Sequence, residues 1–154
     1  MNVKEFTLKT LITVSLLLTL SAAIAKDDQT SWLFVQTAAD FTSDGDTLTI
    51  PYEREIFAFT DRPNRQHAYL NAMELTSIWN TGENNFGENP PNAVLTWVAD
   101  GEIREAEIIL TAAQVSDQGR SITYQFQFEA GHALPETAGQ VSLFIDGAYT
   151  AGWH

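Results

Sequence analysis

The segment NAVLTWVADGEIREAEIILTAAQ, residues 92–114, decides the fold class of this chain. Both of its halves are rich in the β-branched and aromatic residues that favour strands. The halves meet at Asp100-Gly101, a dipeptide typical of two-residue hairpin turns. In the second half, Ala106, Ile108 and Leu110 alternate with other side chains, as on a strand with one buried face. The segment therefore predicts an antiparallel hairpin.

Similar patterns occur on both sides of this hairpin. We predict further strands at residues 31–38, 46–50, 54–59, 121–130 and 139–147, with turn residues between them. The segment SITYQFQFEA alternates most regularly, and its predicted inner face consists of Ile122, Tyr124, Phe126 and Phe128. About seven short strands separated by turns favour a single antiparallel β-sandwich.

One short helix is predicted at about residues 71–80. Asn71 can accept a hydrogen bond as the N-cap, and Glu74 stands three residues later, as in a capping box. An apolar stripe with helical spacing follows, formed by Leu75, Ile78 and Trp79. We expect this helix to close one end of the sheet, with Trp79 as its anchor.

The N-terminus predicts export. Lys4 and Lys9 precede an apolar run that ends in Ala23-Ile24-Ala25, as in a cleavable secretory signal. This run is shorter than the roughly 20 residues that span a bilayer. We therefore expect a signal peptide at residues 1–25, a single β-sandwich domain at residues 26–154, and no membrane span after cleavage. The predicted location is the periplasm or the extracellular space.

Composition limits the choice of partner. The formal net charge is −12, from 20 acidic and 8 basic residues. Nucleic acids and anionic lipids bind to basic surfaces, so this balance argues against both. The chain has no cysteine, so its stability must come from packing and not from disulfides.

The stretch FAFTDRPNRQH, residues 57–67, concentrates charged groups. In a structural interpretation, Asp61 bonds to the following backbone in a turn, and Pro63 holds Arg62 extended. In a functional interpretation, Arg62 and Arg65 form a rare positive site for an anionic group, next to His67. The sequence leaves both interpretations open.

Enzyme signatures are missing from the sequence. It contains no G-x-S-x-G or H-E-x-x-H motif, no glycine-rich phosphate loop and no cysteine nucleophile. Glu105 and Glu107 stand two residues apart on one predicted strand, so they share an outer face and do not face each other across a cleft. The sequence predicts no cofactor and favours a non-catalytic role, although an enzyme without a familiar motif stays open. Metal binding by His67 and His132 is a further alternative.

Four short motifs occur in a distinctive order: FTDRPNR, a helix that carries Trp79, PPNAVL after Phe86, and SLFID. This order resembles a group of small exported bacterial proteins with the pattern F-[ST]-D-R-P-x-R, P-P-N-A and L-F-I-D, which have no established activity. The resemblance implies an exported β-rich domain. It also implies that one structural or binding unit contains Asp61, Arg62, Pro63, Pro91, Asn92 and Asp146.

These observations together predict an exported, non-catalytic binding or envelope-associated protein. Its partner would be a small molecule or a component of the cell envelope. The loop after Asn84 carries an apolar anchor, Phe86, which we expect to pack against the core or the helix and to shape the site. The predicted ligand-binding residues are Asp61, Arg62, Arg65, His67, Phe86, Asn92 and Asp146.

Overall fold

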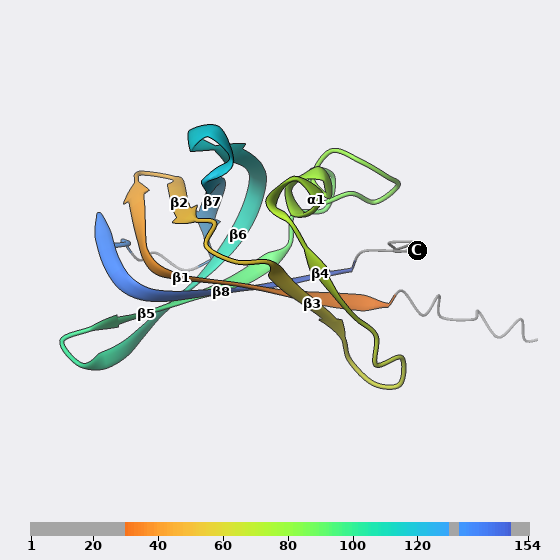
Figure 1. The fold of residues 1–154 in the computed structure, drawn as a ribbon, viewed down its shortest axis with the longest axis horizontal. Helices are drawn as coiled ribbons and strands as arrows, with labels where there is room; N and C mark the ends of the chain where they lie inside the picture. Colours follow the sequence, from red (N-terminus) through yellow and green to blue (C-terminus); the bar gives the residue numbers. More distant parts are fainter. Residues whose placement is uncertain (1–29, 130–132, 149–154) are drawn as a thin grey trace, which may run out of the picture.

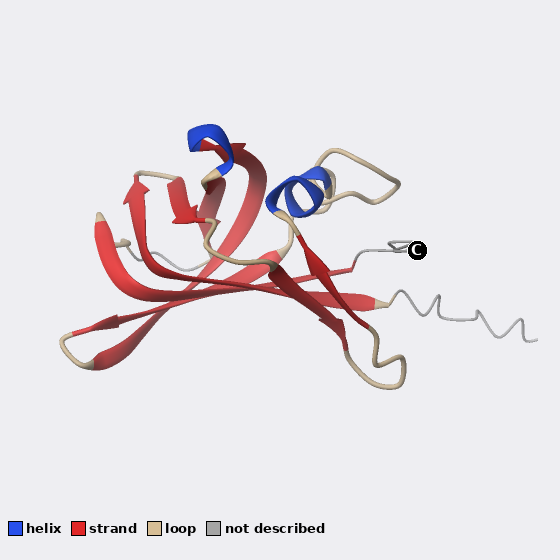
Figure 2. Ribbon diagram, in the orientation of Figure 1, coloured by secondary structure: helices blue, strands red, loops and turns tan. Residues whose placement is uncertain are grey.

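The computed structural model describes residues 30–129 and 133–148. The predicted signal peptide and His132 lie outside these residues. The elements, shown in Figure 2, are β1 (Ser31–Asp44), β2 (Thr47–Pro51), β3 (Ile56–Thr60), β4 (His67–Leu70), α1 (Ala72–Ser77), β5 (Asn92–Ala99), β6 (Glu102–Ser116), the 3-10 turn η1 (Asp117–Gly119), β7 (Ser121–Phe128) and β8 (Thr137–Ala148). The prediction of a mostly antiparallel β domain with one short helix is confirmed.

The eight strands form one antiparallel sheet in the order β2-β7-β6-β5-β8-β1-β3-β4. Because β2 also pairs with β1, six of the strands form a closed ring, and β3 and β4 extend the sheet beyond it (Figure 1). The predicted sandwich form is not confirmed, since this pairing joins all eight strands in a single sheet. The short strand β4 is an addition to the predicted set.

Strand β1 makes this closure possible. Its first part, Trp32 to Val35, pairs with β3, whereas its last part, Thr42 to Asp44, pairs with β2. Along its other edge it pairs with β8 from end to end. The sequence pattern predicted a strand over residues 31–38 and did not assign residues 39–44 to it. In the structure these residues continue the strand and bend it toward β2.

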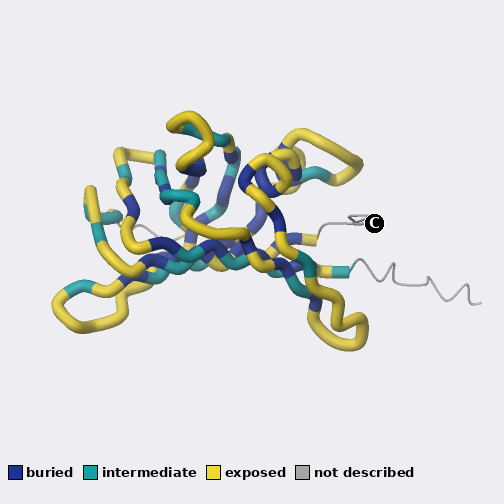
Figure 3. The backbone as a smooth tube through the Cα atoms, in the orientation of Figure 1, coloured by how far each residue is buried: buried dark blue, intermediate teal, exposed yellow. Residues whose placement is uncertain are grey.

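The core fills the ring and the space under α1 (Figure 3). The predicted alternation is confirmed for β6 and β7, where the inward side chains of Ile108, Leu110, Ile122 and Tyr124 have no exposed area. Each large apolar side chain buried in this way contributes about 1.5–3 kcal/mol.

Helix α1 begins as predicted and ends early. Asn71 Oδ1 accepts from the Glu74 backbone N–H at 2.9 Å, and the Glu74 carboxylate accepts from the Asn71 N–H at 2.8 Å. The hydroxyls of Thr76 and Ser77 donate back to helix carbonyls, a pattern that destabilises helices, and the helix ends at Ser77. Trp79 follows in the next turn, where its Nε1 donates to the Leu110 carbonyl at 3.1 Å. The expectation that Trp79 anchors the helix is confirmed.

Phe86 is the second anchor at this end of the ring. Its ring packs edge-on against Phe34 and Trp79, with centroids 6.0 and 5.0 Å away. Gly147 in β8 leaves the space for it, because a Cβ at that position would lie 2.4 Å from the Phe86 ring.

We expect Gly147→Ala to destabilise the protein by about 1–3 kcal/mol, since the added methyl forces Phe86 out of its position. Gly139→Ala in the same strand is the matched control, because its Cβ would meet only the Ala39 carbonyl oxygen at 3.5 Å. Urea denaturation of both variants measures the difference. Equal stability of the two would contradict the proposed packing.

A polar pair lies inside the ring. The Tyr124 hydroxyl donates to Gln36 Oε1 at 2.6 Å, and both side chains are buried. Burial raises the pKa of the Tyr124 hydroxyl above its ordinary value, so this group keeps its proton and remains a donor. Gln36 Nε2 has no hydrogen-bond partner among the described residues. The pair therefore carries one buried donor whose desolvation is uncompensated within the described chain.

Tyr124→Phe removes the hydroxyl that donates to Gln36 Oε1, and we expect a loss of about 1–3 kcal/mol of stability. Gln36→Leu together with Tyr124→Phe replaces both groups by apolar ones, and the double variant should regain most of this loss. A double-mutant cycle in urea measures the coupling. Additive losses would show that the two side chains do not act as a pair.

Candidate functional site

The loop of residues 61–66 joins β3 to β4 and carries Asp61, Arg62 and Arg65. Asp61 Oδ1 accepts from the Arg62 backbone N–H at 2.6 Å, as the structural interpretation of this motif expects. The buried Thr60 hydroxyl accepts from the Gln66 N–H at 2.8 Å. Asn64 Nδ2 donates to Thr30 Oγ1 at 3.1 Å, which ties the loop to the start of β1. Short polar contacts therefore hold this loop in place.

The two arginines of the loop stay available for a partner. Both are exposed. Among the described residues, the ion pairs are Arg104 with Glu102 and Arg120 with Asp117, at 3.0 and 2.7 Å, so neither Arg62 nor Arg65 is paired there. Arg65 has a positive φ of 45°. The hairpin thus presents two unpaired positive charges on a protein of net charge −12.

The sheet register brings other predicted residues into line. His67 lies opposite Phe59, Phe59 opposite Leu33, Leu33 opposite Asp146, and Asp146 opposite Asn92. Directly opposed residues point to the same face of a sheet, so His67, Asp146 and Asn92 share one outer face. Three strand spacings of about 4.8 Å separate His67 from Asp146, so the residues form a surface row and not a compact cluster.

A second row on this face is almost entirely apolar. In register across five strands it contains Tyr69, Phe57, Val35, Phe144 and Val94. Tyr69, Phe144 and Phe57 are 68%, 43% and 36% exposed. The Phe57 ring lies 5.5 Å from that of Phe59 and 5.3 Å from that of Tyr69.

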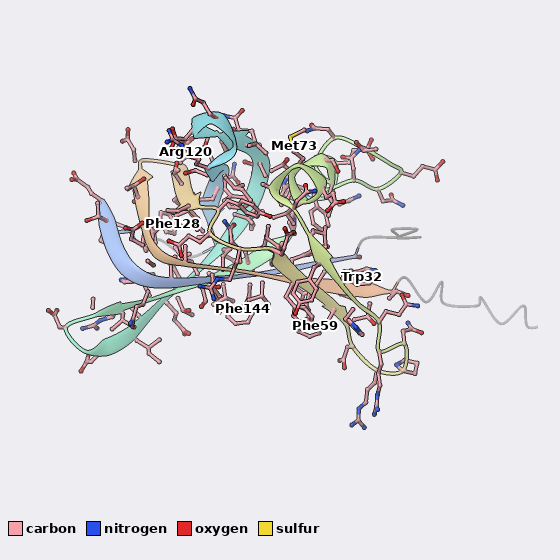
Figure 4. The ribbon with its side chains drawn as sticks, in the orientation of Figure 1. Trp32, Phe59, Met73, Arg120, Phe128 and Phe144 are labelled. Carbon is pink, nitrogen blue, oxygen red and sulfur yellow. The ribbon has the colours of Figure 1, made fainter. Side chains whose placement is uncertain are left out.

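The two rows together form a surface that we name the outer apolar face. Figure 4 shows its labelled members Phe59 and Phe144 on the lower side of the sheet, away from Met73 on α1. Its residues are Leu33, Val35, Phe57, Phe59, Tyr69, Val94 and Phe144.

A hollow of about 350 Å³ lies at one side of the outer apolar face. Its apolar wall includes Leu33, Val94 and Phe144, and its polar rim includes Asn92, Glu107, Glu129 and Asp146. Asp146 Oδ1 accepts from the Ser31 hydroxyl at 3.1 Å. The surface therefore combines an apolar floor with carboxylates at one edge.

Phe86 belongs to a different part of the molecule. It is buried inside the sheet, where Gly147 faces it, whereas the preceding residue Asp146 points outward. Its side chain therefore anchors the 78–91 segment, as predicted. It does not reach the outer apolar face, so it does not join the other predicted ligand-binding residues. Pro91 in the same segment is also buried, and its carbonyl accepts from the Leu110 N–H at 3.0 Å.

Two further findings concern the described residues only. They contain no group of three or more His, Cys, Asp or Glu side chains that could hold a metal ion. The proposed pair of His67 and His132 is not tested, because His132 is not among them. No described helix has the length and hydropathy needed to cross a membrane.

Comparison of the chain with protein-family models, with curated proteins and with solved structures finds no match.

The outer apolar face is a feature that the sequence analysis missed. Its residues come from five separate strands, and only strand pairing places them together. One signal was present: the strand from Ser31 is apolar at successive positions, which indicates a strand with two apolar faces. In the structure Leu33 and Val35 on its outer side remain partly exposed.

We expect Arg62→Ala to change stability by no more than about 0.5 kcal/mol, because the side chain is exposed and unpaired within the described residues. Thr60→Val should cost about 1 kcal/mol, because the variant loses the hydroxyl that accepts from Gln66. Thermal unfolding of both variants measures this contrast. Unfolding of the Arg62 variant would make the arginine structural and remove it from the candidate surface.

Proposed function

We propose that this chain is an exported, non-catalytic binding domain whose recognition surface is the outer apolar face. The observation that carries the proposal is the exposure of Tyr69, Phe57 and Phe144 in one register row, with the partly exposed Val35 between Phe57 and Phe144. Antiparallel sheets with one solvated face normally place polar side chains on it. Soluble proteins rarely expose a large contiguous apolar patch, and where one is exposed it commonly marks an interaction site.

The backbone under this face supports a recognition role. Strands β1 and β8 are paired with neighbours on both edges, so the side chains of the face stand on a rigid base. Aromatic side chains provide a large contact area with little loss of conformational freedom on binding. The carboxylates of Asp146 and Glu107 and the exposed side chains of Arg62 and Arg65 offer polar contacts around the apolar centre.

The remaining parts of the proposal rest on sequence. Residues 1–25 have the pattern of a secretory signal, which supports a periplasmic or extracellular location. The acidic balance supports a partner other than nucleic acid, such as a small molecule or an envelope component.

A thermal-shift screen of the purified protein against oligosaccharides, small anions and divalent metals tests this function. A ligand that binds only the folded state at 100 times its Kd adds about 2.7 kcal/mol to stability. We expect Phe144→Ser to abolish the shift, because it removes the central ring of the face. Met73→Ser is the matched control, since Met73 is 70% exposed on α1 away from the face.

Two outcomes would contradict the proposal. A ligand that still raises the unfolding temperature of both the Phe144→Ser and the Phe57→Ser variant binds elsewhere on the molecule. A shift produced by a metal and lost in His67→Ala and in His132→Ala would favour the metal-binding alternative.

A further inference from the structure

Two projecting hairpins flank the outer apolar face. One is β3–β4 with its loop of residues 61–66, and the other is β5–β6 with its turn at Asp100-Gly101. Asp100 and Gly101 have φ values of 54° and 77°, as a tight two-residue turn requires. In Figure 1 both hairpins extend below the middle of the sheet, on the side to which Phe59 and Phe144 point in Figure 4. The face therefore lies between two raised ends.

The two hairpins carry opposite charge. The β3–β4 hairpin has Arg62, Arg65 and His67 against a single acid, Asp61. The β5–β6 hairpin has an acidic surplus, because its one basic side chain, Arg104, is paired with Glu102 at 3.0 Å. The remaining acids on that hairpin are Asp100, Glu105 and Glu107. The surface thus runs from a basic end through an apolar centre to an acidic end.

Such a surface is complementary to a rotated copy of itself. A two-fold axis that lies in the plane of the face, perpendicular to the line that joins the two hairpin tips, exchanges its two ends. The basic hairpin of each copy then meets the acidic hairpin of the other, and the two apolar centres face each other between them. An interface in which the same patch serves both subunits is the commonest form of protein oligomer. Sheets that pack face to face bury their apolar sides in this manner.

We propose that the occupant of the outer apolar face is a second copy of this chain, held in a two-fold dimer. The inference rests on the proposed function and specifies the partner of the same surface. A small ligand would cover the hollow beside Phe144 but would leave Phe57 and Tyr69 in water. The net charge of −12 opposes association at long range, but salt screens exposed charges beyond about 8 Å at physiological ionic strength. The contacts between hairpins are local and act within that distance.

Sedimentation velocity of the purified protein over a wide concentration range is the first test. We expect a reversible dimer with twice the monomer mass. Phe144→Asp should raise the dimer Kd at least tenfold, whereas Met73→Asp on α1 should leave it unchanged. Circular dichroism and thermal unfolding confirm that both variants fold. A protein that stays monomeric throughout, or a dimer that tolerates Phe144→Asp, overturns the proposal.

Charge exchange tests the arrangement of the two copies. One variant carries Arg62→Glu and Arg65→Glu, and the other carries Glu105→Arg and Glu107→Arg. Each variant alone brings like charges together at both contacts of its dimer, so we expect each to be largely monomeric. In an equal mixture both contacts regain opposite charges, and the heterodimer should form with an affinity close to that of the unchanged protein. Failure of the mixture to associate overturns the two-fold arrangement.

The two proposals fail in distinguishable ways. A monomeric protein whose ligand shift is lost in Phe144→Ser removes the dimer and leaves the binding function in place. A dimer that depends on Phe144 and on the exchanged charges supports both proposals, with the second copy as the partner. If the protein is a monomer and no ligand binding depends on the outer apolar face, both proposals are wrong.

Discussion

The pairing of β1 with three neighbours is the constraint on which the rest of the structure depends. Its first residues hold β3, its last residues hold β2, and β8 follows it along the whole opposite edge. Because β2 also pairs with β7, this one strand closes six strands into a ring. The closure leaves few free edges, and it gives the sheet one enclosed face and one outer face.

The enclosed face determines how the chain can be packed. Large aromatic and aliphatic side chains fill the ring, and Trp79 and Phe86 close one end of it. Gly147 belongs to this arrangement because the Phe86 ring occupies the space that a larger side chain would need. The buried pair of Gln36 and Tyr124 is satisfied in part, since Tyr124 donates to Gln36 Oε1 while Gln36 Nε2 has no partner among the described residues.

The FTDRPNR motif has a part that holds its own loop and a part that is exposed beside the outer face. Asp61 and Thr60 hold the β3–β4 loop, which leaves Arg62 and Arg65 exposed at one end of an apolar surface. The acidic β5–β6 hairpin stands at the other end. An anionic ligand would need the two arginines alone, whereas a copy of the chain would use both ends and the centre together.

Local patterns in the sequence determined the hairpin at Asp100-Gly101, the inward faces of β6 and β7, and the capped start of α1. These features depend on turn geometry, a period of two and hydrogen bonds between residues three apart, so neighbouring residues suffice to predict them. Only the tertiary structure decided the continuation of β1 past residue 38, the closure by β2, and the separation of Phe86 from the other candidate residues. It also placed His67, Asn92 and Asp146 in one row, and Phe57, Phe144 and Tyr69 on one face. The physical reason is that strand register is set between segments far apart in the chain, and register determines which side chains share a face.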